Sequence, residues 1–184
     1  HLFSSAASDV YKRQVFVLIT VGSIYSERFL TLRNLTNVLR QAAYLGTAAL
    51  GEMLVILTAG IDLSIGSLVK LSVLVSAILM DGNPDNVIMA VGLTLALGLG
   101  VGLLHAFFIN ELNLSPFVVT FASLFILQGI SLTITTKPIG RSSKDFLLLY
   151  SQKFFEVPII VYFFGLVTLL IAFLLNMTVF GKHI

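Results

Sequence analysis

The sequence predicts an all-α, polytopic helical membrane protein. Hydrophobic residues make up 57% of the 184 residues, charged residues only 11%, and the mean hydropathy is +1.01. Soluble domains carry about a quarter charged residues, so this composition indicates a chain that lies in lipid. A helix needs roughly 20 apolar residues to cross the hydrocarbon core of a bilayer. Counting the apolar runs on this basis, we expect about five full spans and a truncated first span.

Residues 1–14 are expected to form a non-native or disordered leader. The polar sequence HLFSSAASDVYKRQ changes abruptly at Val15 into membrane-like sequence. Residues Val15–Tyr25 provide about half a span, and the connector SERFLTLRNLTNVLRQ follows them. The chain begins with His1 and ends directly after an apolar run, so we interpret it as a fragment truncated at both ends.

Five further apolar runs follow in order. The first two, Ala42–Leu57 and Ile65–Met80, are short, and each contains one charged residue. The next three contain no charge and are each long enough to span a bilayer: Asn86–Asn110, Leu112–Thr136 and Val157–Gly181.

The connectors between these runs carry recognisable turn signals. DGNPDN, from Asp81 to Asn86, consists of residues that favour turns. Ser115 is expected to be the N-cap of the following helix, with Pro116 in its first position. The connector Thr136–Pro158 is long enough to hold a short helix at the membrane interface.

The sequence LTAGIDLSIGS, from Leu57 to Ser67, places polar residues between two apolar runs. Non-helical backbone at membrane depth needs hydrogen-bond partners, since hydrocarbon provides none. Asp62 or Ser64 is suited to cap the helix that follows. The segment Gly60–Gly66 is therefore predicted to be a helical hairpin turn or a break in a helix.

Two charged residues flank this segment symmetrically. Glu52 lies nine residues before Ile61, and Lys70 lies nine residues after it. Two antiparallel helices would place both side chains at a similar depth. Because a lone charge inside a membrane is expensive, we predict an ion pair between Glu52 and Lys70 within the helical bundle.

The composition argues against several kinds of catalytic or cofactor site. The chain has no cysteine, and its three histidines, His1, His105 and His183, are scattered. We expect His105 to be a packed or interfacial residue. GTAALGEM, from Gly46 to Met53, has the glycine spacing of a phosphate-binding loop but lacks its Lys and Ser/Thr. We therefore expect no catalytic, metal-binding or cofactor-binding residue.

The segment GEMLVILTAGIDLSIGS resembles the stretch typical of the inner-membrane permease subunits of ribose-type ABC sugar importers, which usually contains GGIDLSVGS. A second segment, NLSPFVVTFASLFILQGISL, is similar to that family's P-F-(I/V)-V-T-L run with a later glycine. FLTLRNLTNVLRQAA and the terminal FGKHI give weaker support. The resemblance covers residues 15–184 and implies a partial transmembrane permease domain. The residues that it assigns to the motif and the translocation path are Gly60, Asp62, Ser64, Gly66, Ser67, Pro116, Phe117, Thr120 and Gly129.

This chain departs from the pattern of that family at a few positions. Ala59 replaces the first glycine of the pair, and Glu52 stands where a neutral residue is usual. Lys70 stands in a normally apolar helix, and His105-Ala106 replaces a usual Asn-Gly.

The resemblance implies a function without enzymatic activity. In such importers two permease copies form the path, cytoplasmic ATPase subunits bind ATP and drive it, and a periplasmic or lipid-anchored binding protein delivers a monosaccharide. The expected location is the bacterial inner membrane, which the chain would cross several times.

Two other functions are compatible with the sequence. Permeases for branched-chain amino acids are related but usually have Asn in the corresponding turn, so Asp62 argues against them. An ion-coupled secondary transporter also uses broken helices near the membrane midplane. In that case Glu52, Asp62 and Lys70 would be candidates for a proton or sodium site.

Overall fold

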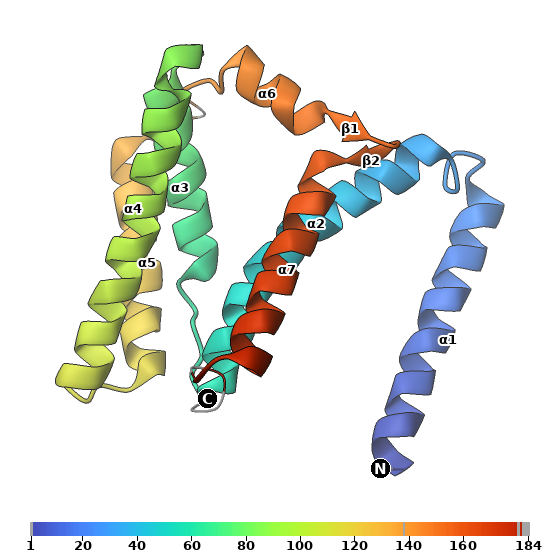
Figure 1. Ribbon diagram of the computed structural model, residues 1–184, viewed down its shortest axis with the longest axis horizontal. Coiled ribbons are helices and arrows are strands. Elements are labelled where there is room, and N and C mark those ends of the chain that lie inside the picture. The colour runs from blue at the N-terminus through green and yellow to red at the C-terminus, as the bar shows by residue number, and fades with distance from the viewer. Residues whose placement is uncertain (1, 138, 180, 182–184) are drawn as a thin grey trace. The chain divides into compact units, whose positions relative to one another are not determined.

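The computed structural model describes residues 2–137, 139–179 and 181, and it consists mainly of helices (Figure 1). The chain divides into two compact units, His1–Ala42 and Ala43–Ile184. Helix α2, Leu32–Leu57, begins in the first unit and continues into the second.

The first unit consists of α1, Leu2–Tyr25, the turn that follows it and the beginning of α2. The Phe29 ring lies directly over Gly22, where an added Cβ would be 2.7 Å from it. The Asn34 side chain donates to the Phe29 carbonyl at 2.7 Å, which fixes the turn before α2. Helix α1 runs through residues 2–14, and the non-native origin of that stretch stays a prediction.

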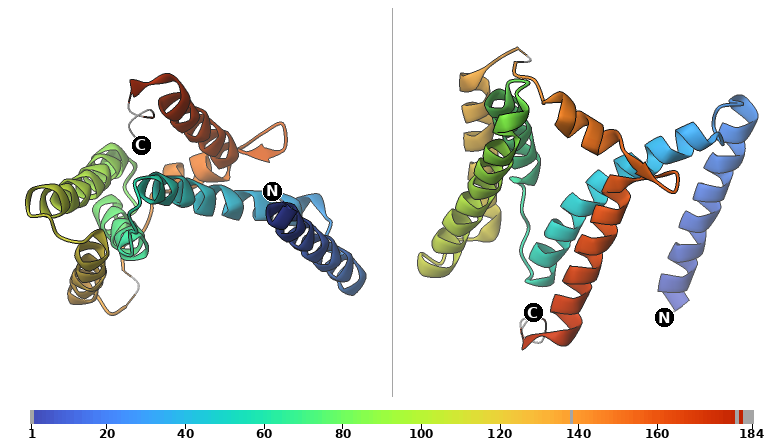
Figure 2. Two further views of the ribbon diagram at one scale, coloured as in Figure 1. Left: turned by 90° about the horizontal axis from the view of Figure 1, so that it is seen from below. Right: turned by 45° about the horizontal axis from the view of Figure 1, so that its top comes forward.

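Three helices lie side by side in the second unit (Figures 1 and 2). The middle of this arrangement is α3, which contacts both of the others along its length. Leu71 of α3 is buried there, with 3% exposure. The three helices are α3, Ile65–Met80; α4, Val87–Ala106, which continues as the π-helical turn Phe107–Glu111; and α5, Pro116–Ile134.

The turn signals in the sequence explain where these helices begin and end. Asp81 adopts a left-handed conformation, with φ of 40°, at the end of α3. The side chain of Asn83 then accepts from the Asp85 amide at 3.0 Å and opens the short 3₁₀ helix Pro84–Asn86. Ser115 is the N-cap of α5 and Pro116 its first residue, as predicted, although the Ser115 hydroxyl makes no capping hydrogen bond.

The long connector contains a short helix, as the sequence suggested. Helix α6, Lys144–Ser151, starts where the Ser143 hydroxyl accepts from the Phe146 amide at 3.1 Å. A two-stranded antiparallel hairpin follows, formed by β1, Lys153–Phe154, and β2, Val157–Pro158. It leads into α7, Ile159–Met177.

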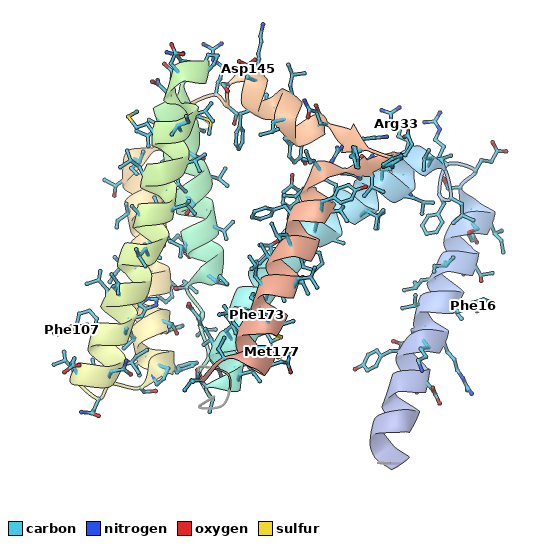
Figure 3. All side chains as sticks on the ribbon, viewed as in Figure 1. Phe16, Arg33, Phe107, Asp145, Phe173 and Met177 are labelled. Carbon is cyan, nitrogen blue, oxygen red and sulfur yellow. The ribbon has the colours of Figure 1, made fainter. Side chains whose placement is uncertain are left out.

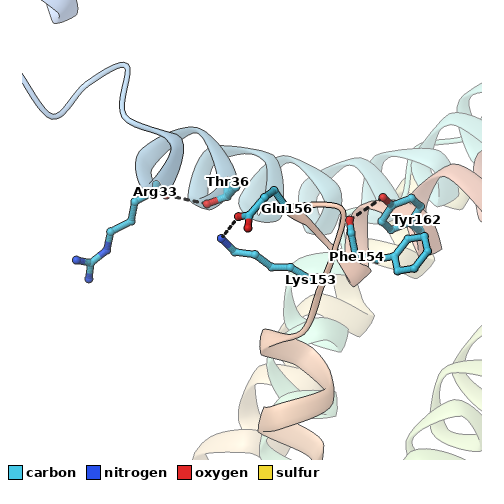
Figure 4. A network of polar contacts seen from close by, with 6 residues as sticks. All are labelled: Arg33, Thr36, Lys153, Phe154, Glu156 and Tyr162. Atoms are coloured by element: carbon cyan, nitrogen blue, oxygen red, sulfur yellow. Dashed lines mark hydrogen bonds and ion pairs between the residues drawn. The ribbon is translucent and has the colours of Figure 1, made fainter.

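Side-chain contacts fix the hairpin locally (Figure 4). Lys153 Nζ lies 3.2 Å from Glu156 Oε2 across the turn. The Tyr162 hydroxyl donates to the Phe154 carbonyl at 2.9 Å and so joins the hairpin to the first turn of α7. The same view shows the Thr36 hydroxyl of α2, which donates to the Arg33 carbonyl within its own helix at 3.0 Å.

Gly46 allows close contact between α2 and α7. A Cβ at this position would lie 2.6 Å from the Phe164 ring. The glycine spacing of GTAALGEM therefore serves helix packing at Gly46.

The structure confirms a helical membrane protein. Three helical segments are long and apolar enough to cross a bilayer: Pro84–Glu111, Pro116–Ile134 and Ile159–Met177. Their outward side chains are large and apolar, such as Phe107, Phe173 and Met177 with exposures of 51%, 59% and 74% (Figure 3). Lipid is the solvent that suits helices with apolar side chains on all faces.

The connector after α5 crosses α3 at Gly140. The Arg141 amide donates to the Ala77 carbonyl at 3.1 Å, and the Gly82 amide donates to the Arg141 carbonyl at 2.7 Å. Gly140 has φ of +77°, and a Cβ there would lie 2.5 Å from the Ala77 backbone. Only glycine fits this position, for both reasons.

Replacing Gly140 by alanine should destabilise the protein more than the same change at Gly82. Gly82 has the same φ of +77° but no atom within 4 Å of an added Cβ. We expect Gly82→Ala to lower the free energy of unfolding by about 1–2 kcal/mol through backbone strain. Gly140→Ala adds an overpacking cost of about 1–3 kcal/mol. Thermal unfolding in nanodiscs measures the difference, and equal effects would show that the close approach to Ala77 does not exist.

Candidate functional site

The candidate site begins where α2 ends. The Gly60 amide donates to the Val55 carbonyl at 3.0 Å, and the Ala59 amide donates to the Ile56 carbonyl at 2.9 Å. This pair of bonds is the Schellman motif, in which the residue at the Ala59 position takes a left-handed conformation and is usually glycine. Ala59 has φ of +59°. The family's glycine at this position therefore has a physical reason, and this chain carries an alanine there.

Asp62 orders the backbone between α2 and α3. Its Oδ1 accepts from the Ser64 amide at 2.8 Å and from the Ser64 hydroxyl at 2.7 Å. Ser64 is fully buried, and its carbonyl accepts the first hydrogen bond of α3 from the Leu68 amide at 2.9 Å. Ser64 is thus the N-cap residue, but its hydroxyl caps no helix amide. The carboxylate instead forms an Asx turn, which directs the chain into α3.

Thr120 connects this segment to α5. The Thr120 side chain is buried, and its hydroxyl lies 3.0 Å from the Ile61 carbonyl and 2.9 Å from the Pro116 carbonyl. One proton is shared between these two acceptors. Ile61 and Thr120 are 59 residues apart in the sequence. Their contact brings together the two motif segments, the GIDLS linker and the start of α5.

Of the other motif residues on α3 and α5, Phe117 joins this contact through its carbonyl, which lies 3.5 Å from the Thr120 hydroxyl. Gly66 and Gly129 have no atom within 4 Å of an added Cβ, so no close approach within the described chain requires them to be glycine. Ser67 lies in the first turn of α3. Phe117 is half exposed and stacks on Phe121 with ring centroids 5.8 Å apart.

The predicted ion pair between Glu52 and Lys70 is not formed in this structure. Glu52 Oε1 instead accepts from the Asp62 amide at 3.3 Å. Glu52 Oε2 is buried and has no hydrogen-bond partner among the described residues. Lys70 is exposed. It lines a groove whose opposite wall, at the end of α5, includes Ser131 and Thr135.

The shape of the linker explains this difference. The symmetric spacing of Glu52 and Lys70 about Ile61 predicts a tight turn there, but the chain is non-helical throughout residues 58–64. This linker returns past the last turns of α2, so that Asp62 lies beside Glu52. Lys70 is five residues into α3, about 8 Å from its start. α3 also packs on α4 and α5 rather than forming a hairpin with α2.

A polar pair that the sequence did not predict lies between α4 and α5. His105 is buried, and its Nε2 lies 2.8 Å from the Ser123 hydroxyl oxygen. The pair borders a cavity of about 380 Å³ that is otherwise lined by apolar side chains such as Leu71 and Leu127. This contact agrees with a packed histidine. Within residues 2–137, 139–179 and 181, no cluster of three or more His, Cys, Asp or Glu residues could hold a metal ion.

A helical membrane protein with a hydrogen-bonded, non-helical linker is typical of transport proteins, where irregular backbone lines the path or a moving element. Comparison with family models also indicates a transport protein. The model described as the permease component of the branched-chain amino acid transport system matches residues 34–184. The chain belongs to this family of permeases.

Its curated relatives include sugar import permeases from Escherichia coli (strain K12). The ribose import permease protein RbsC is 32% identical over 175 residues, which cover 92% of this chain and 54% of that protein. The D-allose transport system permease protein AlsC is 31% identical over 169 residues, covering 91% and 52%. The galactose/methyl galactoside import permease protein MglC is 29% identical over 190 residues, covering 92% and 56%.

This chain spans about half the length of these curated relatives. No solved structure matches the chain.

Replacing Ala59 by glycine should stabilise the protein. Ala59 has φ of +59°, and a left-handed conformation costs an L-residue roughly 1–2 kcal/mol, whereas glycine adopts it freely. We expect Ala59→Gly to raise the free energy of unfolding by about 1 kcal/mol. Ala49→Gly, in the interior of the same helix, is the matched control and should lower it by about 0.5–1 kcal/mol. If thermal unfolding shows the same change in stability for both variants, Ala59 does not have a left-handed conformation.

Proposed function

We propose that this chain is part of the permease subunit of an ABC importer that moves a ribose-like monosaccharide across the bacterial inner membrane. The observation that carries the proposal is the similarity to permeases named for ribose, D-allose and galactose import, over more than nine-tenths of this chain. The acidic GIDLS linker supports the same assignment, because the corresponding turn of branched-chain amino acid permeases usually has Asn.

The linker of residues 58–64 is proposed to border the translocation path. Non-helical backbone at membrane depth is tolerated where it is buried in protein or lines a water-filled cavity. Asp62 Oδ1 is engaged by Ser64, while Oδ2 makes no hydrogen bond within the described residues. A sugar hydroxyl that passes this point can donate to Oδ2. A single such contact is weak, which suits a path that must release its cargo.

The Thr120 contact is proposed to transmit movement. The hydroxyl of Thr120 on α5 donates to the Ile61 carbonyl of the linker, next to Asp62. A shift of α5 would therefore change the position of Asp62. In the assembled importer such a shift would follow from ATP binding to the partner ATPase subunits, since we assign no ATP, metal or catalytic site to this chain.

We propose that the complete importer contains further subunits. A second permease copy, cytoplasmic ATPase subunits and a periplasmic or lipid-anchored sugar-binding protein would join this chain. About five full spans and one partial span in this segment would make it a multi-pass protein, with α2 and α3 counted in addition to the three long apolar helices.

Uptake by the complete transporter tests the function. The full permease that contains this segment is expressed with its ATPase and binding protein in cells that lack ribose uptake, and labelled ribose, D-allose, galactose and leucine are compared. We expect saturable uptake of a sugar that persists with an uncoupler while ATP is maintained. Uptake of leucine alone would identify an amino acid permease. Loss of sugar uptake with the uncoupler at constant ATP would identify a secondary transporter.

Variants of Asp62 in the same assay test the site. Asp62→Asn keeps an oxygen that accepts from Ser64, whereas Asp62→Ala removes it. We expect Asn to retain at least half of the uptake rate and Ala to lose about tenfold or more, since an unpaired buried group costs about 1–3 kcal/mol. Equal uptake by the Ala variant at equal membrane abundance would contradict the role of this turn.

A further inference from the structure

A groove of about 420 Å³ lies between α3 and the end of α5. One wall is the face of α3 formed by Lys70, Val73, Leu74 and Ala77, which follow each other at helical spacing. The other wall is the end of α5 and the connector that follows it, including Lys137. We call this the lysine groove.

The charges in the lysine groove are uncompensated. Its lining includes Lys70 and Lys137 but no carboxylate. Neither lysine forms an ion pair with any of the described residues. A lone charge within a membrane is expensive and usually has a partner. Two cations in one groove without an acidic side chain therefore indicate an anion from outside the chain.

The position of the groove along α3 indicates the depth of this anion. The polar connector crosses α3 at Ala77, where the Arg141 amide donates to the Ala77 carbonyl. Lys70 is seven residues from Ala77, about 10 Å along the helix. Long lysine side chains bury their methylene groups and extend the charge toward the membrane surface. Both charges can therefore reach the layer of the lipid headgroups.

Local hydrogen bonds hold Lys137 at the groove. The Thr135 hydroxyl accepts from the Lys137 amide at 3.0 Å and donates to the Lys137 carbonyl at 2.6 Å. The crossing at Gly140 anchors the connector to α3 a few residues later. The Thr135 contacts therefore fix the backbone of Lys137 beside the groove.

We propose that the lysine groove binds the headgroup of an anionic phospholipid. The phosphate would lie between the ammonium groups of Lys70 and Lys137, and the acyl chains would follow the apolar flank of the groove. That flank is open to the surroundings, since Val73, Leu132 and Ile139 are 63%, 50% and 44% exposed. A soluble anion would gain no binding energy from the apolar flank. A phospholipid would contact both the lysines, through its phosphate, and the flank, through its acyl chains. Basic pockets between transmembrane helices bind lipid headgroups in this way.

Native mass spectrometry of the full chain with mixed lipids tests the proposal. The protein is titrated with phosphatidylglycerol and phosphatidylcholine, and the apparent dissociation constant of each is measured for the wild type and variants. Lys70→Gln with Lys137→Gln removes both charges, and the double Arg variant keeps them. Lys144→Gln, on the exposed surface of α6 and outside the groove, is the matched control.

We expect tight binding of phosphatidylglycerol by the wild type, the Lys144 control and the double Arg variant. The double Gln variant should bind it about 25-fold more weakly, roughly fivefold for each lysine. Its thermal stability in phosphatidylcholine, measured in parallel, should equal that of the wild type, because neither lysine side chain forms an ion pair or a hydrogen bond with another described residue.

Three results would overturn the proposal. Equal affinity of the wild type and the double Gln variant for phosphatidylglycerol would show that the groove is not the site. Displacement of the lipid by millimolar glycerol phosphate would identify a soluble phosphate ligand. A change from dimer to monomer in the double Gln variant, with lipid binding unchanged, would identify the groove as an interface between copies of this chain.

Discussion

The structure depends on satisfying the backbone of a seven-residue linker, residues 58–64 between α2 and α3, for which we propose a place inside the membrane. Hydrocarbon offers no hydrogen bonds, so the chain itself must provide them. The end of α2 is satisfied by the Schellman motif around Ala59, and the Ser64 amide by the Asp62 carboxylate. The Ile61 carbonyl is satisfied from another helix, by the Thr120 hydroxyl. Each polar residue of this segment has a structural task.

These bonds hold the linker both locally and against α5. Asp62 and Ser64 fix the local turn, while a single long-range bond from Thr120 fixes its position against α5. A transporter needs such a combination, because its irregular segments must keep their shape while helices move around them. Glu52 stands where the family usually has a neutral residue; its Oε1 accepts from the Asp62 amide, and its buried Oε2 has no hydrogen-bond partner within the described part of the chain.

Much of this architecture could be predicted from the sequence. Length and apolarity identified α4, α5 and α7, and Ser115-Pro116 marked the start of α5. The GIDLS segment was correctly expected to be non-helical. The Glu52–Lys70 pair was not formed, because counting residues from Ile61 assumed a tight turn where the linker is extended. The contact between Thr120 and Ile61 could not be derived from spacing, because residues far apart in the sequence meet only through the packing of α3 on α5.

A double-mutant cycle between Asp62→Ala and Thr120→Val tests whether these two side chains hold the same linker. The free energy of unfolding of the wild type, both single variants and the double variant is measured in one lipid. If both side chains hold the same linker, loss of one weakens what the other can stabilise, and we predict a coupling energy of at least about 0.5 kcal/mol. Strictly additive effects would mean that Asp62 and Thr120 stabilise independent parts of the protein and do not hold a common linker.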